Sequence, residues 1–419
     1  MARAWIISTG TELTLGQTLD RNAAWLAEQL AALGVATERI VIVPDARDAI
    51  RDAIAQAARA CEVVIITGGL GPTNDDVTRQ ALADAAGLPL ELDQACLARL
   101  RAFFTERGRE MPDANRVQAL MPRTARALPN WCGTAPGLAL TVEGARCYAL
   151  PGVPFEMMDM FQREVAPELE TIAAGQVLVS RRLRCFGTPE SELGVRLRDW
   201  MVRGRNPEVG TTAELGEITL HIRARAPSGA EAQTLLDDAE REIRRRLGIV
   251  VFGRDDETLA GVVGRLLLDA TATLSTAESC TGGLVGEMLT AVPGSSRYYL
   301  GGVVAYANEV KQQWLHVSPQ TLERHGAVSE AVARAMAAGA RAVFGSSYAL
   351  AVTGIAGPAG GSVEKPVGLV FLGLASPRSV SARQLLCGPQ TPRQVIRERA
   401  ARSVLNLLRL ELLGVVENR

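Results

Sequence analysis

Short apolar segments alternate with longer amphipathic segments along most of this chain, and this alternation limits the fold more than any other feature. Near the start, apolar runs at 5–8, 40–43 and 63–67 are separated by stretches at 19–33 and 49–60 whose apolar residues recur at helical spacing. Repeated strand–helix–strand units predict a parallel sheet covered by helices. A second series of this kind begins near residue 254, so the sequence predicts two α/β domains.

A smaller segment separates the two series. Residues 173–253 alternate in the order strand, helix, two strands, helix, strand, which predicts a compact α+β module of the KH-like type. The chain of 419 residues is also too long for one ordinary domain of about 100–200 residues. We therefore expect an α/β protein with domains at 1–172, 173–253 and 254–419.

Composition excludes several classes of protein. The formal net charge is −1, whereas non-specific binding to nucleic acid needs a surplus of cations. The basic run at 244–246 either contacts RNA or forms a solvated helix face, and we expect the solvated face because no G-x-x-G loop precedes it. Seven scattered cysteines without a C-x-x-C pair indicate reduced thiols, and no apolar run approaches the length of a membrane span. We expect a cytoplasmic protein that binds neither nucleic acid nor membrane.

Two glycine-rich turns follow strands of the first domain. One contains Gly10 and Glu12, and the other is the segment TGGLGPTNDD at 67–76. Ligands of open α/β sheets bind beyond the carboxyl ends of the strands, and a glycine loop that enters a helix presents free N–H groups to phosphate. The predicted phosphate-binding residues are Gly68, Gly69, Gly71 and Thr73.

Acidic residues accompany this loop. Asp75, Asp76 and Glu12 supply carboxylates suited to a divalent cation that bridges a diphosphate and activates water. The same acids also suit a helix start, where they cap free N–H groups. Since capping alone does not require the preceding GGLGPT, we favour a phosphate and metal site.

A second candidate site lies in the segment TLSTAESCTGGLVGEML of the third domain. Ser279 occupies the turn between a strand and a helix, where a serine is exposed and helix N–H groups stabilise a developing oxyanion. In the rival interpretation, Thr281, Gly282 and Gly283 cradle a phosphate. Cys280 is a competing nucleophile.

A serine nucleophile needs a base, and the chain offers few candidates. His316 and His325 lie in a helical stretch where packing or capping explains them. Of the 45 basic residues only Lys311 and Lys365 are lysines, and lysine, unlike arginine, loses its proton readily when buried. Lys311 follows the strand-like segment GGVVAYANEV, so we predict that it is the base and that Tyr306 assists it.

Two further segments complete this predicted site. The glycine run that contains Thr353, Gly354 and Gly357 follows an apolar strand and forms either an anion loop or a hairpin turn; we favour the anion loop. Arg393 and Arg397 lie one turn apart on the last helix, where they either grip a phosphate or face solvent.

Several of these segments resemble one known family. STGTELTLGQTLDRNAAWLAEQL, ITGGLGPTNDDVTRQALA and ALPGVPFEMMDM resemble the MoaB-like domain at the N-terminus of CinA proteins. AESCTGG, LGGVVAYANEVK and AVTGIAGPAGGSVEKPVG resemble the C-terminal domain of the same family, the nicotinamide-mononucleotide deamidases. The resemblance implies Ser279 as nucleophile, Lys311 as base, Tyr306 as an assisting hydroxyl, and the Thr353–Gly354 loop as part of the carboxamide and phosphate pocket.

The resemblance also implies the reactions. The C-terminal domain would hydrolyse nicotinamide mononucleotide to nicotinate mononucleotide and ammonia without a metal, in pyridine-nucleotide salvage. The N-terminal domain would cleave ADP-ribose with a divalent metal such as Mg, Mn or Co. MoaB-like domains commonly self-associate, so we expect a homo-oligomer. The alternative is a competence-related nucleotide-sensing protein in which one site or neither is active.

Overall fold

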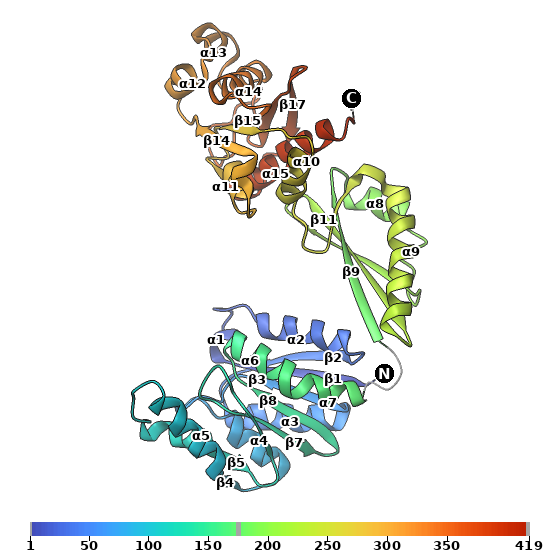
Figure 1. Cartoon of the computed structure of the whole chain (residues 1–419), viewed down its shortest axis with the longest axis vertical. Coiled ribbons are helices and arrows are strands. Elements are labelled where there is room, and N and C mark those ends of the chain that lie inside the picture. The colour runs from blue at the N-terminus through green and yellow to red at the C-terminus, as the bar shows by residue number, and fades with distance from the viewer. Residues whose placement is uncertain (1, 173–176, 416–419) are drawn as a thin grey trace. The chain divides into compact units, whose positions relative to one another are not determined.

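The computed structural model describes residues 2–172 and 177–415 (Figure 1). They belong to two compact units: Met1–Ser180 with Arg223–Leu236, and Arg181–Ile222 with Asp237–Arg419. The predicted boundary between the first two domains, at 172/173, borders residues that lie outside the described ranges.

A six-stranded sheet forms the centre of the N-terminal domain, in the order β2-β1-β3-β8-β7-β6. Strands β2, β1, β3 and β8 are parallel, whereas β7 and β6 are antiparallel to their neighbours. The sheet is therefore mixed and not wholly parallel as predicted, because β7 and β8 are joined by a tight turn at Glu143 and Gly144 with positive φ (49° and 90°), too short for a parallel crossover. The strands are β1 Arg3–Thr9, β2 Ala36–Val43, β3 Val63–Thr67, β6 Arg126–Leu128, β7 Gly137–Val142 and β8 Ala145–Leu150.

Helices cover both faces of this sheet, and β1 and β3 are therefore buried on both sides. Trp5 and Ile7 pack into one core with residues of α3, α4 and α5, while Ala4 and Ile6 point into the other core with residues of α2 and α6. The elements outside the sheet are α1 Thr11–Thr14, α2 Arg21–Ala32, α3 Arg47–Ala60, α4 Thr78–Ala86, β4 Leu90–Leu92, α5 Gln94–Thr105, η1 Asp113–Ala119, β5 Leu120–Pro122, α6 Pro154–Met160, η2 Phe161–Val165 and α7 Ala166–Ile172.

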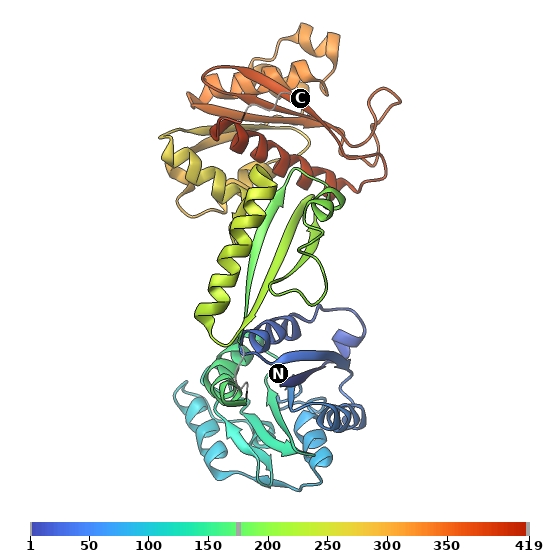
Figure 2. The same cartoon turned by 90° about the vertical axis from the view of Figure 1, so that its right-hand side faces the viewer.

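The middle module has a four-stranded sheet in the order β10-β11-β9-β12, with the long helix α9 beside it (Figure 2). This agrees with the predicted α+β module. Strand β12 is antiparallel to β9. The elements are β9 Val177–Phe186, α8 Glu190–Arg196, β10 Glu208–Glu214, β11 Glu217–Ala226, α9 Gly229–Leu247, η3 Gly248–Val250 and β12 Val251–Arg254.

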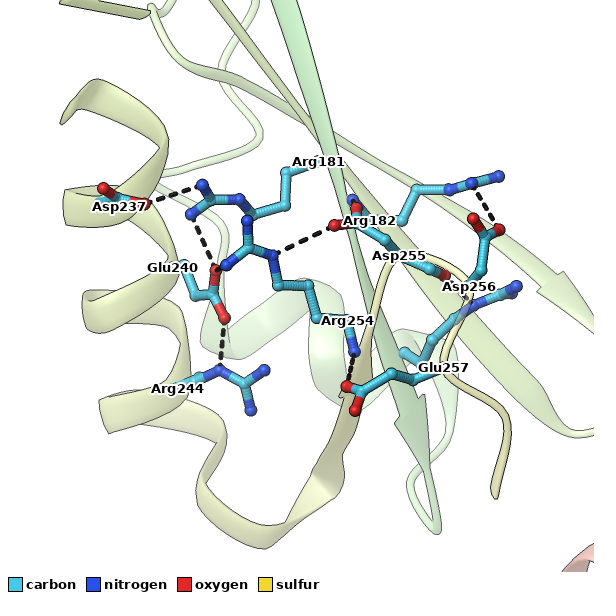
Figure 3. Close-up of polar contacts among 10 residues, drawn as sticks. Arg181, Arg182, Asp237, Glu240, Arg244, Arg254, Asp255, Asp256 and Glu257 are labelled. Atoms are coloured by element: carbon cyan, nitrogen blue, oxygen red, sulfur yellow. Dashed lines mark hydrogen bonds and ion pairs between the residues drawn. The ribbon is translucent and has the colours of Figure 1, made fainter. Parts of the chain in front are cut away.

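The basic run of α9 is paired with acids. Arg244 donates to Glu240 (2.7 Å), which also accepts from the buried Arg181 of β9 (2.8 Å), as Figure 3 shows. Arg245 and Arg246 both donate to Glu242 at 2.7 Å. These charges are largely neutralised within the module, which favours the solvated-face interpretation over an RNA contact.

The C-terminal domain contains a five-stranded sheet in the order β14-β13-β15-β16-β17. The first three strands are parallel and the last two are antiparallel to their neighbours. The sequence did not predict β17, whose residues are mostly part-exposed and so lack an apolar run. The elements are α10 Leu259–Asp269, β13 Leu274–Glu278, α11 Leu284–Thr290, η4 Ser295–Arg297, β14 Tyr299–Val304, α12 Asn308–Leu315, α13 Pro319–His325, α14 Glu330–Phe344, β15 Tyr348–Gly354, β16 Leu369–Ala375, β17 Val380–Leu386 and α15 Arg393–Leu412.

The histidines of this domain occupy helix ends. His316 is the residue after α12 and has a positive φ of 54°, and His325 is the last residue of α13. These positions agree with the expected capping roles. None of the helices in the described ranges combines the length and apolar character needed to cross a bilayer.

Candidate active sites

Ser279 lies at the carboxyl edge of the C-terminal sheet, between two other strand ends, and at 9% exposure it is buried and not exposed as expected, because both neighbouring strand ends pack against it. Its amide, just after β13, donates to the carbonyl of Val352 in β15 (2.9 Å). The amide of Ala305, just after β14, donates to the carbonyl of Glu278 (2.7 Å). Parallel pairing thus brings Ser279, Ala305 and Thr353 side by side at this edge.

The side chain of Lys311 ends at the same edge. Lys311 belongs to α12 and is 1% exposed. Its Nζ donates to the carbonyls of Ala305 (2.8 Å) and Tyr306 (3.1 Å). Burial lowers the pKa of Lys311, while the negative charge of Glu309 acts in the opposite direction. A desolvated amine beside the Ser279 turn has the property that a general base requires.

Glu278 is a part of this site that sequence reasoning missed. Its buried carboxylate accepts three backbone N–H groups at the start of α11, those of Gly283 (3.0 Å), Val285 (3.0 Å) and Gly286 (2.8 Å). We predicted that amides of this turn, including that of Gly283, bind phosphate or an oxyanion. In the structure, these three amides donate to the carboxylate of Glu278 instead, because a buried carboxylate needs hydrogen-bond donors. The sequence did contain a signal for this role, because Glu278 directly precedes a turn that leads into a helix.

The other residues of the turn have conformational roles. Gly282 and Gly283 have positive φ values of 62° and 97°, which glycine adopts without strain, and the amide of Gly282 donates to the carbonyl of Ser279 (3.1 Å). The hydroxyl of Thr281 is buried and has no hydrogen-bond partner among residues 2–172 and 177–415. Burial raises the pKa of the Cys280 thiol to about 12, which makes it a poor competing nucleophile.

Two arginines of α15, Arg393 and Arg397, reach the loops of this edge, although Arg393 is also exposed to solvent. Arg397 donates to the carbonyl of Thr281 through Nη2 (2.8 Å) and Nε (3.3 Å). Arg393 donates to the carbonyl of Gly357 (2.8 Å) and to the Tyr306 hydroxyl (3.0 Å). Beside them is a hollow of about 460 Å³ lined by Leu284, Glu287, Arg393, Gln394, Arg397 and Glu398.

The segment that contains Thr353 also has internal partners. The Thr353 hydroxyl donates to the carbonyl of Ala327 (2.8 Å). A Cβ at Gly354 would lie 2.7 Å from Val370 Cγ2, so this glycine lets β15 approach β16 closely. Gly357 has a positive φ of 73° and presents its carbonyl to Arg393. Internal contacts therefore account for the residue types at Thr353 and Gly354. The carbonyl of Gly357, in contrast, lies beside Arg393.

In the glycine-rich loop of the N-terminal domain, the backbone at Gly68 and Gly69 lies very close to neighbouring segments. Gly68 and Gly69 have positive φ values of 106° and 65°. A Cβ at Gly68 would lie 2.6 Å from the Thr9 carbonyl oxygen, and one at Gly69 would lie 2.2 Å from Thr78 Oγ1. Asn22 donates to the hydroxyl of Thr67 (3.2 Å) and to the carbonyl of Gly152 (2.8 Å). The three resemblance-bearing segments of the domain therefore meet at one place.

The acids of this loop surround Thr73. The Thr73 amide donates to Asp76 (2.9 Å), and its hydroxyl contacts the carboxylates of both Asp75 and Asp76. No side chain caps α4, so the capping interpretation is wrong. Glu12 instead lies against Gly10. Within 2–172 and 177–415 no three His, Cys, Asp or Glu side chains form a group that could hold a metal, so these three acids do not form a ready-made metal site.

Comparison with known proteins covers all three domains. Residues 5–171 match the family described as "Probable molybdopterin binding domain", 180–253 the "Damage-inducible protein CinA KH domain", and 256–412 the "CinA C-terminal domain". A Symbiobacterium thermophilum protein described as competence-damage inducible is 46% identical over 99% of this chain and 100% of its own length. A CinA-like protein of Thermosynechococcus vestitus is 45% identical over 98% and 99%.

A solved structure matches part of the chain. The competence/damage inducible protein CihA of Agrobacterium tumefaciens is 41% identical, and the match covers 37% of this chain and 93% of that one with a TM-score of 0.36. The relatives, in contrast, match over nearly the full length of both sequences. The chain therefore belongs to the CinA family.

Proposed function

We propose that the C-terminal domain hydrolyses the carboxamide of nicotinamide mononucleotide to nicotinate mononucleotide and ammonia. Ser279 attacks the amide carbon while Lys311 takes the hydroxyl proton. The amine leaves as ammonia with a proton returned from Lys311, and water then hydrolyses the acyl-enzyme with the same base. This sequence of steps needs no metal ligand from the chain.

The observation that carries this proposal is the environment of Lys311 Nζ. A neutral amine has two N–H donors and one lone pair. The carbonyls of Ala305 and Tyr306 accept two donors at 2.8 and 3.1 Å, which leaves the lone pair of the neutral amine to accept a proton. Burial favours the neutral form, so the amine is suited to accept a proton.

The charges near the site suit the substrate. Nicotinamide mononucleotide carries a positive pyridinium ring and a negative phosphate. The hollow beside the Ser279 turn is lined by Arg393 and Arg397 together with Glu287 and Glu398, so it presents both signs of charge. Arg397 is the candidate partner for phosphate, because guanidinium binds phosphate oxygens well.

For the N-terminal domain we propose cleavage of ADP-ribose to AMP and ribose 5-phosphate. Two carboxylates, Asp75 and Asp76, converge on Thr73, and Mg²⁺ is commonly held by one or two carboxylates plus substrate phosphates. When bound, a divalent cation would neutralise the diphosphate and lower the pKa of water. The chain would bind the phosphates with Gly68, Gly69, Gly71 and Thr73.

Ammonia release from nicotinamide mononucleotide, measured with chelator present, tests the main proposal. Wild type should release ammonia, and Ser279→Ala and Lys311→Arg should lose it, since arginine keeps the charge but cannot act as base. Lys365→Arg is the matched control, because it changes the only other lysine. An active Lys311→Arg variant would show that the base is another group. A wild type that releases no ammonia would favour the nucleotide-sensing alternative.

A separate assay tests the N-terminal domain. AMP formation from ADP-ribose should require Mg²⁺, Mn²⁺ or Co²⁺ and should be lost in Asp76→Asn, whereas ammonia release by that variant should be unchanged. Formation of AMP in the presence of chelator would contradict the role given to the carboxylates.

A further inference from the structure

A buried arginine of the N-terminal domain forms no ion pair within the described part of the chain, and Asp76 is the acid that attracts it most strongly. Arg79, in the first turn of α4, is fully buried. Its Nη2 donates to the carbonyl of Leu70 at 3.3 Å, whereas Nε and Nη1 are buried without any hydrogen-bond partner in the described part of the chain. No step proposed above uses this residue.

Arg79 lies directly behind the glycine-rich loop. The Leu70 carbonyl that it contacts belongs to this loop and is also approached by Gln118 Nε2 (3.5 Å). The Gln118 side chain accepts from Asn115 (2.8 Å), and both residues are buried. A buried polar layer, consisting of Arg79, Gln118 and Asn115, therefore underlies the backbone that leads to Gly71 and Thr73.

The attraction of Asp76 does not offset the burial of the Arg79 charge. Burial lowers the pKa of Arg79 to about 10 although Asp76 attracts the guanidinium and acts in the opposite direction, so the side chain is still charged at neutral pH. Buried charges are costly unless they are paired and hydrogen-bonded. Arg409 of the C-terminal domain shows the usual solution, because its Nε donates to Asn406 (2.9 Å) and its Nη2 to the carbonyl of Ile249 (2.7 Å). Arg79 has unused donors where Arg409 has partners.

We propose that Arg79 is the buried counter-charge for a diphosphate group, and that the loop at 68–76 binds this group without a divalent cation. The inference rests on the proposed ADP-ribose activity and deepens it by separating anion recognition from the metal. The field of a buried cation is screened less by salt than that of a surface cation. It adds to the positive end of α4, while Asp75 and Asp76 remain available for the metal.

Calorimetric titration of the full chain with inorganic diphosphate, in chelator, tests this proposal. Wild type should bind, and Arg79→Met should bind at least about tenfold more weakly. Arg79→Lys, which keeps the charge, should lose less affinity. Arg409→Met is the matched control, since it removes a buried arginine that has partners, and its diphosphate affinity should equal that of wild type.

Hydrogen exchange of the α4 amides provides the readout that separates this role from a structural one. Removal of an unpaired buried charge should slow exchange in Arg79→Met, whereas Arg409→Met should speed exchange in α15. Faster α4 exchange in Arg79→Met, failure of that variant to fold, or unchanged diphosphate affinity would each overturn the proposal.

Together, these measurements distinguish failure of the inference from failure of the enzymatic proposal. Diphosphate binding that depends on Arg79, in a wild type that does not cleave ADP-ribose, would refute the pyrophosphatase activity and retain the inference. If wild type cleaves ADP-ribose but its diphosphate affinity does not depend on Arg79, the pyrophosphatase activity is supported and the inference about Arg79 is refuted.

Discussion

Replacement of Glu278 by glutamine should loosen the turn that carries Ser279, the proposed nucleophile. The carboxylate of Glu278 is 2% exposed and holds three backbone N–H groups of α11 through both of its oxygens. Glutamine has nearly the same shape but only one acceptor oxygen. In Glu278→Gln, the amide NH₂ therefore faces at least one backbone N–H that has no other acceptor.

The magnitude follows from these bonds. One buried N–H left without an acceptor costs about 1–3 kcal/mol, and each remaining bond loses roughly 1 kcal/mol when its acceptor becomes neutral. Relief from burying a charge offsets part of this cost. We expect α11 to lose about 2–4 kcal/mol of local stability, which corresponds to amide exchange about 30- to 700-fold faster.

Hydrogen exchange of the peptide at 274–291 is the assay, with ammonia release measured on the same samples. Faster exchange should be confined to the turn and α11, and kcat/KM should fall because Ser279 is displaced. Glu323→Gln is the control, since it makes the same chemical change at an exposed position of α13. Unchanged exchange in Glu278→Gln would refute the reasoning that this carboxylate holds the helix start.

Three other predictions concern the two sites. For ammonia release, kcat/KM should rise with pH through a pKa below 10.5, because burial lowers the pKa of Lys311 and the base acts when neutral; a flat profile in steady-state kinetics would contradict this. Cys280→Ala should retain activity and iodoacetamide should not inactivate wild type, because burial raises the pKa of Cys280 to about 12; rapid inactivation would identify a reactive thiol. Gly71→Ala should abolish AMP formation from ADP-ribose but leave ammonia release intact, since a Cβ there would lie 2.4 Å from Oδ2 of Asp76; retained AMP formation would show that Asp76 is dispensable.

The α/β class and the positions of most buried strands were predictable from local sequence. The apolar run at Val63–Thr67 has the same bounds in the structure. A strand that is buried on both faces consists of apolar residues almost without interruption, so its position is visible in the sequence. The apolar segments of β7 and β16 were also recognisable as strands, but their antiparallel direction was not predictable from this pattern. Strand β17 is part-exposed, so its residues lack the apolar signal that identifies a buried strand.

The candidate residues were predictable because they follow strands, but their partners were not. Ser279 and Lys311 were identified from a turn and from the scarcity of lysine. Lys311 Nζ donates to the carbonyls of Ala305 and Tyr306 because of the way α12 packs against the sheet edge, and the sequence does not show this packing. That Glu278 occupies the helix amides depends on its burial.

By itself, the sequence determined which residue types stand at the ends of which strands, because hydrophobic periodicity and glycine positions are local properties of the chain. Only the tertiary structure decided which side chains lose contact with water. Lys311, Glu278 and Arg79 are all charged residue types that normally lie on surfaces, and all three are buried here. Desolvation depends on segments distant in sequence that pack around each group. It favours the neutral amine of Lys311, requires the hydrogen bonds that Glu278 accepts from the start of α11, and leaves Arg79 as a buried cation.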